Sequence, residues 1–450
     1  MNGGFRGHGA MPRVLVCTVS SWNDRVGGDT YTALFSGYDR NKLANLFIRE
    51  ETPNSSVCTR YFRISESRVI RSVLKRRIAT GKELRGADIV PEREDLEAQR
   101  DTAARYEKHR RKRSWILLYA REILWRLGRW KTPELDAFLD DFKPDVVLFG
   151  MEGYIHFNRI NRYIVRRTGA RAIGYFYDDN FTYKQRPWNL GYRVYRFFQR
   201  RDLKKTARCC SAFFAISPKT KREADEFFGI DSILLTKPVS DNGFGWTPYI
   251  PRKPLKMLYT GNLLIGRLAT LKLVGDALHA VNGDESRIAL HVYTTTDVST
   301  KEAADLDSSI HLHGAVPQGE VVARQKEADV LLFIEDLLGP YRKTARLSFS
   351  TKITDYLGSG RCILAIGDRS LASMEYLRDE EAALCACSES EVLEVLQQLT
   401  SDPSLVSEYG RRAFECGHRN HDERLVRARL HSVICGVVEG ASGVSRSLPS

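Results

Sequence analysis

Short apolar runs alternate with longer amphipathic segments over most of the 450-residue chain. In the first half, the apolar runs lie at residues 13–20, 145–150, 171–177, 212–217 and 232–237. A second series lies at residues 255–261, 288–294, 310–314, 328–335, 362–366 and 383–387. Runs of this kind indicate buried strands, and helix-length segments between them are typical of parallel sheets. The pattern predicts an α/β protein with doubly wound parallel sheets.

A stretch rich in proline and glycine, residues 238–254, separates the two series of strands. Such a stretch holds no regular element and marks a hinge between domains. The length is also too great for one hydrophobic core of ordinary size. We therefore expect a first domain at 11–240, a second at 255–410 and a C-terminal helix at 411–438.

A charged segment, residues 60–131, interrupts the first series and is expected to be a helical insertion. Its end carries a basic cluster and then an apolar helical stripe of Ile116, Ala120, Ile123, Leu127 and Trp130. Trp115 and Trp125 flank that stripe. A basic, tryptophan-flanked helix fits an anionic membrane surface. Packing of the same stripe against the domain core is an equally good interpretation.

Charge and cysteine content narrow the class of protein. The chain has 69 Lys and Arg against 56 Asp and Glu, so its net charge of +13 favours anionic partners. Nine cysteines without paired CxxC spacing indicate buried thiols in a reducing compartment.

No apolar run approaches the roughly 20 residues that span a bilayer. We expect a cytoplasmic protein, peripheral on the inner face of the membrane if the basic helix binds lipid.

The sequence SFSTKITDYLGSGRCILAIG, residues 348–367, carries the clearest binding signal. Ser350 or Thr351 is expected to start a helix, which the glycines at 358 and 360 end before a buried strand. The first turn of a helix offers unpaired N–H groups and a positive dipole end, and Lys352 adds a full charge beside them. This segment predicts a site for an anionic ligand.

Three segments of the second domain resemble the GT-B glycosyltransferases, and among them the family-4 type. They are LYTGNL at 258–263, GAVPQGEVVARQKEADVLLFIE at 314–335 and STKITDYLGSGRCILAIG at 350–367. The resemblance implies two Rossmann-like domains that face each other across a cleft. It also implies an enzyme that takes a nucleotide diphosphate sugar as its donor.

The same resemblance implies the donor-binding residues. Asp355 would hold the ribose hydroxyls, and the amides around Ser350 and Thr351 would lie by the diphosphate with Lys352. Arg267, beyond the turn at Gly261 and Asn262, would place a second cation on the leaving diphosphate. Two positions depart from the family pattern. Asn262 stands where an arginine is usual, and Leu347 stands where the first acid is usual, so that Glu335 or Asp336 at the end of the preceding strand is the expected substitute.

The first domain supplies the acceptor-side candidates. Asp178 and Asp179 follow the strand at 171–177, where the family often has a histidine. They are plausible ligands of sugar or acceptor, and equally plausible caps of the next helix. Gly27 and Gly28 lie in the loop after the first strand, where they either approach a ligand or only form a turn.

The resemblance implies sugar transfer with retention of configuration, and the expected catalytic residues are Arg267, Lys352, Asp178 and Asp179. Asp305 and Asp307 read as a surface turn, so neither a metal nor a cofactor is expected. The acceptor is expected to be lipid-linked or a saccharide of a surface glycan. The alternatives are a GT-B-like scaffold without activity, an epimerase of the same fold, and a nucleic-acid binder, for which we find no motif.

Overall fold

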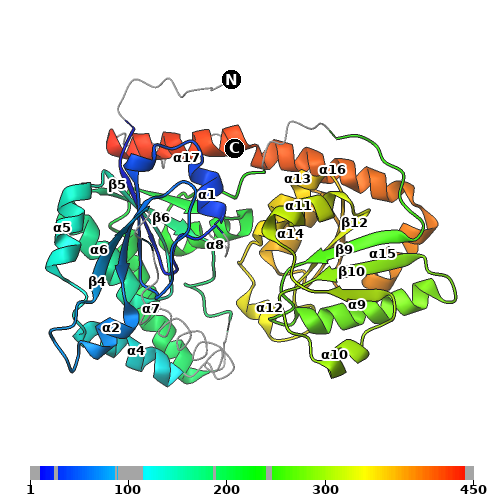
Figure 1. Ribbon diagram of the computed structural model, residues 1–450, viewed down its shortest axis with the longest axis horizontal. Helices are drawn as coiled ribbons and strands as arrows, with labels where there is room; N and C mark the ends of the chain where they lie inside the picture. The colour runs from blue at the N-terminus through cyan, green and yellow to red at the C-terminus, as the bar shows by residue number, and fades with distance from the viewer. Residues whose placement is uncertain are drawn as a thin grey trace.

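The computed structural model describes residues 11–24, 29–86, 89, 115–185, 189–239 and 246–440, and it forms two α/β domains (Figure 1). The sheet of the first domain has the order β4-β3-β2-β1-β5-β6-β7-β8, with every pair parallel except β3 and β4. Its strands are β1 (Val14–Thr18), β2 (Leu43–Phe47), β3 (Arg60–Ile64), β4 (Gly81–Arg85), β5 (Val146–Gly150), β6 (Arg171–Phe176), β7 (Ala212–Ala215) and β8 (Ile233–Leu234). Its helical segments are α1 (Asp29–Phe35), η1 (Arg40–Lys42), α2 (Glu66–Arg71), α4 (Trp115–Leu127), α5 (Pro133–Phe142), α6 (Ile155–Thr168), α7 (Leu190–Ala207) and α8 (Pro218–Phe228).

The second domain has a parallel sheet of order β11-β10-β9-β12-β13-β14. Its strands are β9 (Leu255–Thr260), β10 (Ile288–Tyr293), β11 (Ile310–His313), β12 (Val330–Ile334), β13 (Cys362–Ile366) and β14 (Leu384–Ala386). Its helices are α9 (Arg267–Asn282), α10 (Thr300–Ala304), α11 (Gln318–Lys326), α12 (Tyr341–Thr344), α13 (Thr351–Ser359), α14 (Ala372–Asp379), α15 (Glu389–Ser401) and α16 (Ser404–His421). The central strands β12 and β13 are buried throughout, because helices cover both faces of the sheet. The doubly wound parallel architecture expected for both domains is confirmed.

The segment expected as an insertion belongs partly to the sheet. β3 and β4 lie within residues 60–131 and extend the first sheet beyond β2. β4 has mostly polar side chains and pairs antiparallel with β3 at the edge of the sheet. It therefore lacks the apolar run that marks a buried parallel strand. Helix α4 follows it and packs against α2, α6 and α7.

The predicted apolar stripe of α4 does not face the core. Ile116, Ala120, Ile123 and Leu127 are exposed, whereas Trp125 is buried and stacks on His156. Trp130, expected in the stripe, lies beyond the helix and is buried against Tyr163. The basic residues 108–113 and the side chain of Trp115 fall outside the described part of the chain. Across the described residues, no helix is long and apolar enough to cross a bilayer.

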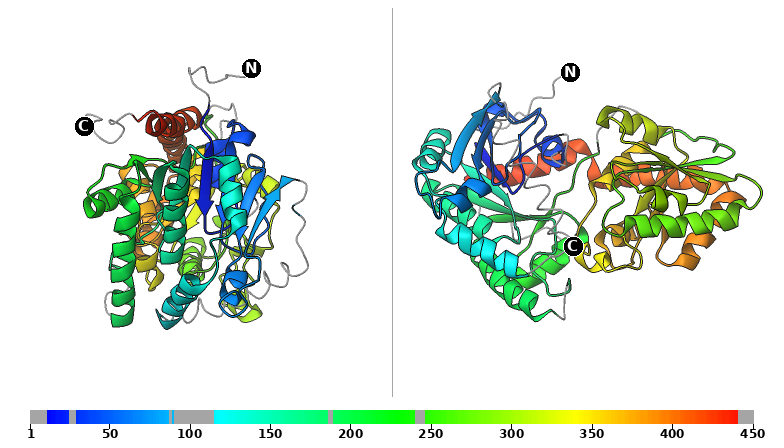
Figure 2. Two further views of the ribbon diagram at one scale, coloured as in Figure 1. Left: turned by 90° about the vertical axis from the view of Figure 1, so that its left-hand side faces the viewer. Right: turned by 60° about the horizontal axis from the view of Figure 1, so that its bottom comes forward.

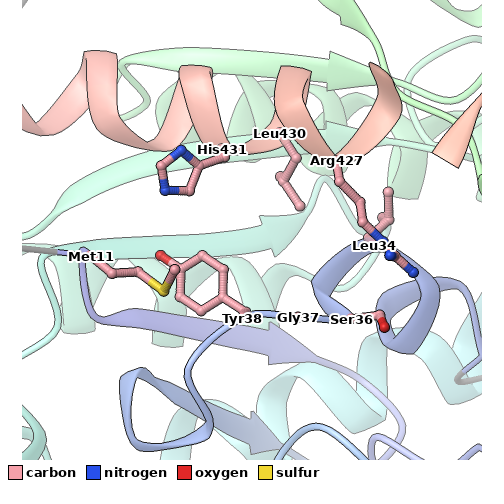
Figure 3. Close-up of a pocket in the computed structure, with 8 residues that line it drawn as sticks. All are labelled: Met11, Leu34, Ser36, Gly37, Tyr38, Arg427, Leu430 and His431. Atoms are coloured by element: carbon pink, nitrogen blue, oxygen red, sulfur yellow. The ribbon is translucent and has the colours of Figure 1, made fainter. Parts of the chain in front are cut away.

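The C-terminal helical region is divided between the two domains. Helix α16 packs on α13 and β13 of the second domain, and α17 (Glu423–Val438) returns to pack on α1 and β5 of the first (Figures 1 and 2). Where α17 meets the first domain, Arg427, Leu430 and His431 face Met11 and Tyr38 across a small pocket (Figure 3). The guanidinium of Arg427 also donates to the carbonyl oxygen of residue 33, at 2.9 Å. The single C-terminal helix expected at 411–438 is therefore two helices that meet at Asp422.

Candidate functional site

Arg267 lies at the carboxyl ends of β9 and β12, where α9 begins. Its guanidinium donates to both carboxylate oxygens of Glu335, with nitrogen-to-oxygen distances of 2.8 to 3.1 Å. Its remaining nitrogen donates to the amide oxygen of Asn262 at 2.8 Å. Such a bidentate ion pair fixes the plane of the guanidinium. The structure thus brings together three residues that the sequence analysis placed in one site.

Lys352 reaches the same place from the first turn of α13. Its ammonium lies 3.4 Å from the Tyr259 hydroxyl and passes directly over Gly261. Gly261 has a φ of 140° and a Cβ there would lie 2.0 Å from the Lys352 nitrogen, so both the backbone and the lysine require glycine. Burial, followed by the nearby Arg267, lowers the pKa of Lys352 to about 8, while Glu335 acts in the opposite direction. A ligand anion would restore the charge that burial disfavours.

Helix α13 presents its N-terminus beside this lysine. Ser350 is the N-cap residue with extended backbone, its side chain makes no capping hydrogen bond, and its amide donates to the Ser373 hydroxyl at 3.3 Å. Thr351 is the first helical residue, as expected, and the helix ends at Gly360 in the left-handed conformation. The positive end of the helix dipole and Lys352 therefore act on the same point.

Asp355 points toward the connection between the domains. Its carboxylate pairs with the Lys237 ammonium at 2.7 Å, and Lys237 follows the last strand of the first domain. The carboxylate expected to hold the ribose thus has a protein cation as partner in this structure.

The missing family acid at Leu347 has a structural explanation. Leu347 is fully buried among residues of the first-domain core, and its carbonyl oxygen accepts from the Thr220 hydroxyl at 3.0 Å. Of the two acids after β12, Glu335 joins Arg267, whereas Asp336 accepts from the amides of residues 339 and 341 and so stabilises a turn. Glu335 is therefore the acid placed in the cluster.

Asp178 and Asp179 have different surroundings, although they are adjacent. Asp178 keeps solvent contact and accepts a hydrogen bond from the Ser348 hydroxyl, two residues before the α13 cap. Asp179 is buried, caps Thr182 and pairs with Arg346 of the second domain at 3.0 Å. Asp178 thus lies at the candidate site, and Asp179 joins the two domains.

Glu152 and Tyr177 were not singled out from the sequence. Glu152 follows β5 and accepts a hydrogen bond from the Tyr177 hydroxyl, which follows β6 beside Asp178. Burial raises the pKa of Glu152 to about 7; the Tyr177 hydrogen bond lowers it and Asp178 raises it. The sequence signal that could have identified Glu152 is an acid just after an apolar strand, and the same signal identified Asp178.

Three expectations concern other parts of the chain. Gly27 and Gly28 lie outside the described residues. Within the described ranges, no group of three or more His, Cys, Asp or Glu side chains could hold a metal ion. All nine cysteines are free thiols.

Comparisons with known proteins identify the architecture. A scan against protein-family models finds no match, and a search of curated proteins finds no relative in sequence. Among solved structures, the chain is similar to HepE from Anabaena in complex with UDP and glucose, with a TM-score of 0.59, 9% identity, and coverage of 94% of this chain and 100% of HepE. It is also similar to α,α-trehalose 6-phosphate synthase from Burkholderia multivorans, with a TM-score of 0.58, 11% identity, and coverage of 96% and 100%.

A third similar structure is sucrose-phosphate synthase from Thermosynechococcus elongatus, with a TM-score of 0.56, 11% identity, and coverage of 95% and 99%. All three extend over both domains of this chain. The expected fold is therefore confirmed: the protein has the GT-B glycosyltransferase fold, with two Rossmann-like domains in the order that the sequence predicted.

Proposed function

We propose that the protein is a glycosyltransferase that binds a nucleotide diphosphate sugar on its second domain. The observation that carries this proposal is the Lys352 ammonium, held over Gly261 at the N-terminus of α13. A buried cation at a positive helix end is a site for a diphosphate. The GT-B neighbours support the proposal, since HepE is described in complex with UDP and glucose.

In the proposed reaction, the bond between the sugar's anomeric carbon and the diphosphate oxygen breaks. A bond from the same carbon to an acceptor hydroxyl oxygen forms, and the hydroxyl proton passes to the departing diphosphate. Lys352 and the α13 amides stabilise the charge that develops on the leaving group, with Arg267 as the second cation. This arrangement needs neither a metal ion nor a cofactor, and it accords with the retention expected from the family-4 resemblance.

The acceptor is proposed to bind on the first domain, where Glu152, Tyr177 and Asp178 adjoin the donor helix through the contact of Asp178 with Ser348. Ionised carboxylates accept hydrogen bonds from sugar hydroxyls. A lipid-linked or polysaccharide acceptor of a surface glycan and a peripheral membrane location in the cytoplasm remain part of this proposal. Gly27 and Gly28 remain candidates for the acceptor-side loop.

A thermal-shift panel of UDP, GDP, ADP and CMP tests the donor site. A ligand that binds only the folded state raises the melting temperature. We expect one nucleoside diphosphate to stabilise the wild type and Lys301→Ala, an exposed lysine on α10, but not Lys352→Ala. The nucleotide shift of Asp355→Ala, compared with that of the wild type, tests whether the Asp355 carboxylate leaves Lys237 and holds the ribose. If no nucleotide shifts the wild type at millimolar concentration, the proposal fails.

The second candidate is a GT-B-shaped scaffold without activity. Two observations favour it. Leu347, buried in the first-domain core, replaces the sugar-binding acid of the family pattern, and Asp355, at the position of the ribose-binding acid, is paired with Lys237. Transfer or hydrolysis of the donor sugar that binds best would exclude the scaffold. Binding without either reaction, in the presence of a range of hydroxyl acceptors, would favour it.

A further inference from the structure

Two neighbouring helices of the first domain each expose several large apolar side chains. Helices α4 and α7 pack against each other, with Tyr119 and Tyr195 in edge contact, and run side by side along one face of the domain (Figure 2, right). The exposed apolar residues of this α4–α7 face are Ile116, Leu117, Ile123, Leu127, Leu190, Val194, Phe197 and Phe198. Single exposed apolar residues are common, but such a set on adjoining helices marks an interaction surface.

Each helix already has a buried side, so the exposed side is not needed for the core. Trp125 of α4 and Leu203 of α7 are fully buried. On the opposite side, Leu127 keeps 65% of its surface exposed, and Phe197 and Phe198 keep 53% and 49%. Burying these side chains against a partner would gain hydrophobic free energy that folding leaves unused.

Among the described residues of α4, α7 and the loop after α2, the exposed charges are basic. The acids of the two helices, Glu122 and Asp202, point inward, where they contact His156 and Arg162. Helix α2 packs on α4, and Leu74 in the loop after α2 is 91% exposed. The exposed basic residues of this loop and of the two helices include Lys75, Arg76, Arg77, Arg126, Arg201, Lys204 and Lys205.

We propose that the α4–α7 face docks on an anionic lipid bilayer. Apolar side chains that enter the interface and cations that meet lipid phosphates are the two terms that bind a peripheral protein to a membrane. A second copy of the same face is a poor partner, because it would bring like charges together. Nucleic acid would match the charge but not Leu127, Phe197 and Phe198.

Docking here has a consequence for the acceptor. Arg196 of α7 donates to the carbonyl oxygen of Asp179 at 3.3 Å, so this helix adjoins the loop of the proposed acceptor side. A lipid-linked acceptor could then enter the site from the bilayer. This last step rests on the proposed function, whereas the docking itself does not.

Flotation of the full chain with lipid vesicles tests the docking. Vesicles of phosphatidylcholine alone are compared with vesicles that also contain phosphatidylglycerol. We expect the wild type to float with the anionic vesicles, and Ile123→Ser/Leu127→Ser and Phe197→Ser/Phe198→Ser to lose most of this binding. Arg201→Ser and Lys205→Ser should each weaken partitioning about fivefold at low salt.

Leu425→Ser is the matched control, because Leu425 on α17 is 61% exposed and lies outside the face. It should float like the wild type, and unchanged melting temperatures would show that all variants fold. Equal flotation of wild type and α4–α7 variants, absence of wild-type flotation, or retention by an oligonucleotide instead of vesicles would each overturn the proposal. Nucleotide binding is measured separately, so its failure would be distinguishable from failure of docking.

Discussion

The guanidinium of Arg346 lies 3.0 Å from the buried carboxylate of Asp179, although the two residues belong to different domains. Arg346 also pairs with Glu223 of α8, so a single side chain neutralises two acids of the first domain. Lys219 and Arg222 make the reverse connection, from the first domain to Glu375. These contacts fix how closely the candidate donor and acceptor sides approach.

Replacing Arg346 by alanine is expected to destabilise the contact between the domains. It leaves Asp179 buried without its cation, and breaking a buried pair in this way costs about 3–5 kcal/mol. We expect a lower melting temperature and a larger radius of gyration by small-angle scattering. Arg342→Ala is the control, because Arg342 is more exposed and pairs within the second domain, with Asp368. Equal behaviour of the two variants would contradict this role of Arg346.

Gly261→Ala is expected to abolish most nucleotide binding while the protein stays folded. The added Cβ would displace the Lys352 ammonium, and the φ of 140° is unfavourable for alanine. Gly283→Ala controls for backbone strain, because Gly283 also has positive φ but an added Cβ there would meet no other side chain within 4 Å. Titration calorimetry with the best nucleotide compares the two. Unchanged affinity in Gly261→Ala would show that the diphosphate does not bind at Lys352.

The pH profile of sugar transfer is expected to have an acidic limb near pH 7 that is caused by Glu152. The ionised carboxylate accepts a hydrogen bond from an acceptor hydroxyl, and burial raises its pKa to about 7, so that activity should fall as pH drops through this value. In Glu152→Gln we expect kcat/KM for the acceptor to fall about 10- to 100-fold and the limb to disappear. Glu83→Gln, on the edge strand β4, should keep the wild-type profile. An unchanged limb in Glu152→Gln would assign it to another group.

His421 is expected to make the fold sensitive to acid. It is buried and hydrogen-bonded to the hydroxyls of Thr236 and Tyr376, and burial lowers its pKa to about 4. Between that value and the unfolded value near 6.5, only the unfolded chain binds the proton. The free energy of unfolding should therefore fall with decreasing pH over this range, by up to about 3 kcal/mol.

The variant His421→Asn should flatten this dependence of unfolding free energy on pH. His279→Asn, which replaces a largely exposed histidine of α9, should leave it as in the wild type. Denaturant titrations at pH 4.5, 5.5 and 6.5 compare the three proteins. Parallel curves for His421→Asn and the wild type would mean that other groups control acid unfolding.

Local sequence predicted most of the fold, because buried parallel strands are short apolar runs. The runs at 362–366 and 145–150 are strands of the structure within one residue of where the pattern placed them. β3 was missed because two of its five residues are arginines, one of them held by Glu83 of the edge strand. An apolar pattern cannot reveal a strand whose polar side chains find partners only after folding.

The candidate site likewise contains residues that the sequence predicted and contacts that it did not predict. Arg267, Gly261 and Lys352 lie near strand ends and a helix start, positions that the sequence pattern marks directly. The pairing of Asp355 with Lys237 joins residues 118 positions apart, and that of Asp179 with Arg346 joins residues 167 apart. No local rule anticipates such partners, which depend on how two domains meet.

Helix α17 means that the first domain is not a contiguous stretch of chain. Val426, Leu430 and Ile434 of this helix belong to the same buried cluster as Val14, Leu34 and Phe35. During synthesis on the ribosome, that surface stays uncovered until nearly the whole second domain has emerged. The order of translation therefore sets the order of folding: the half made first is completed last, and a product ending before Glu423 would leave it open.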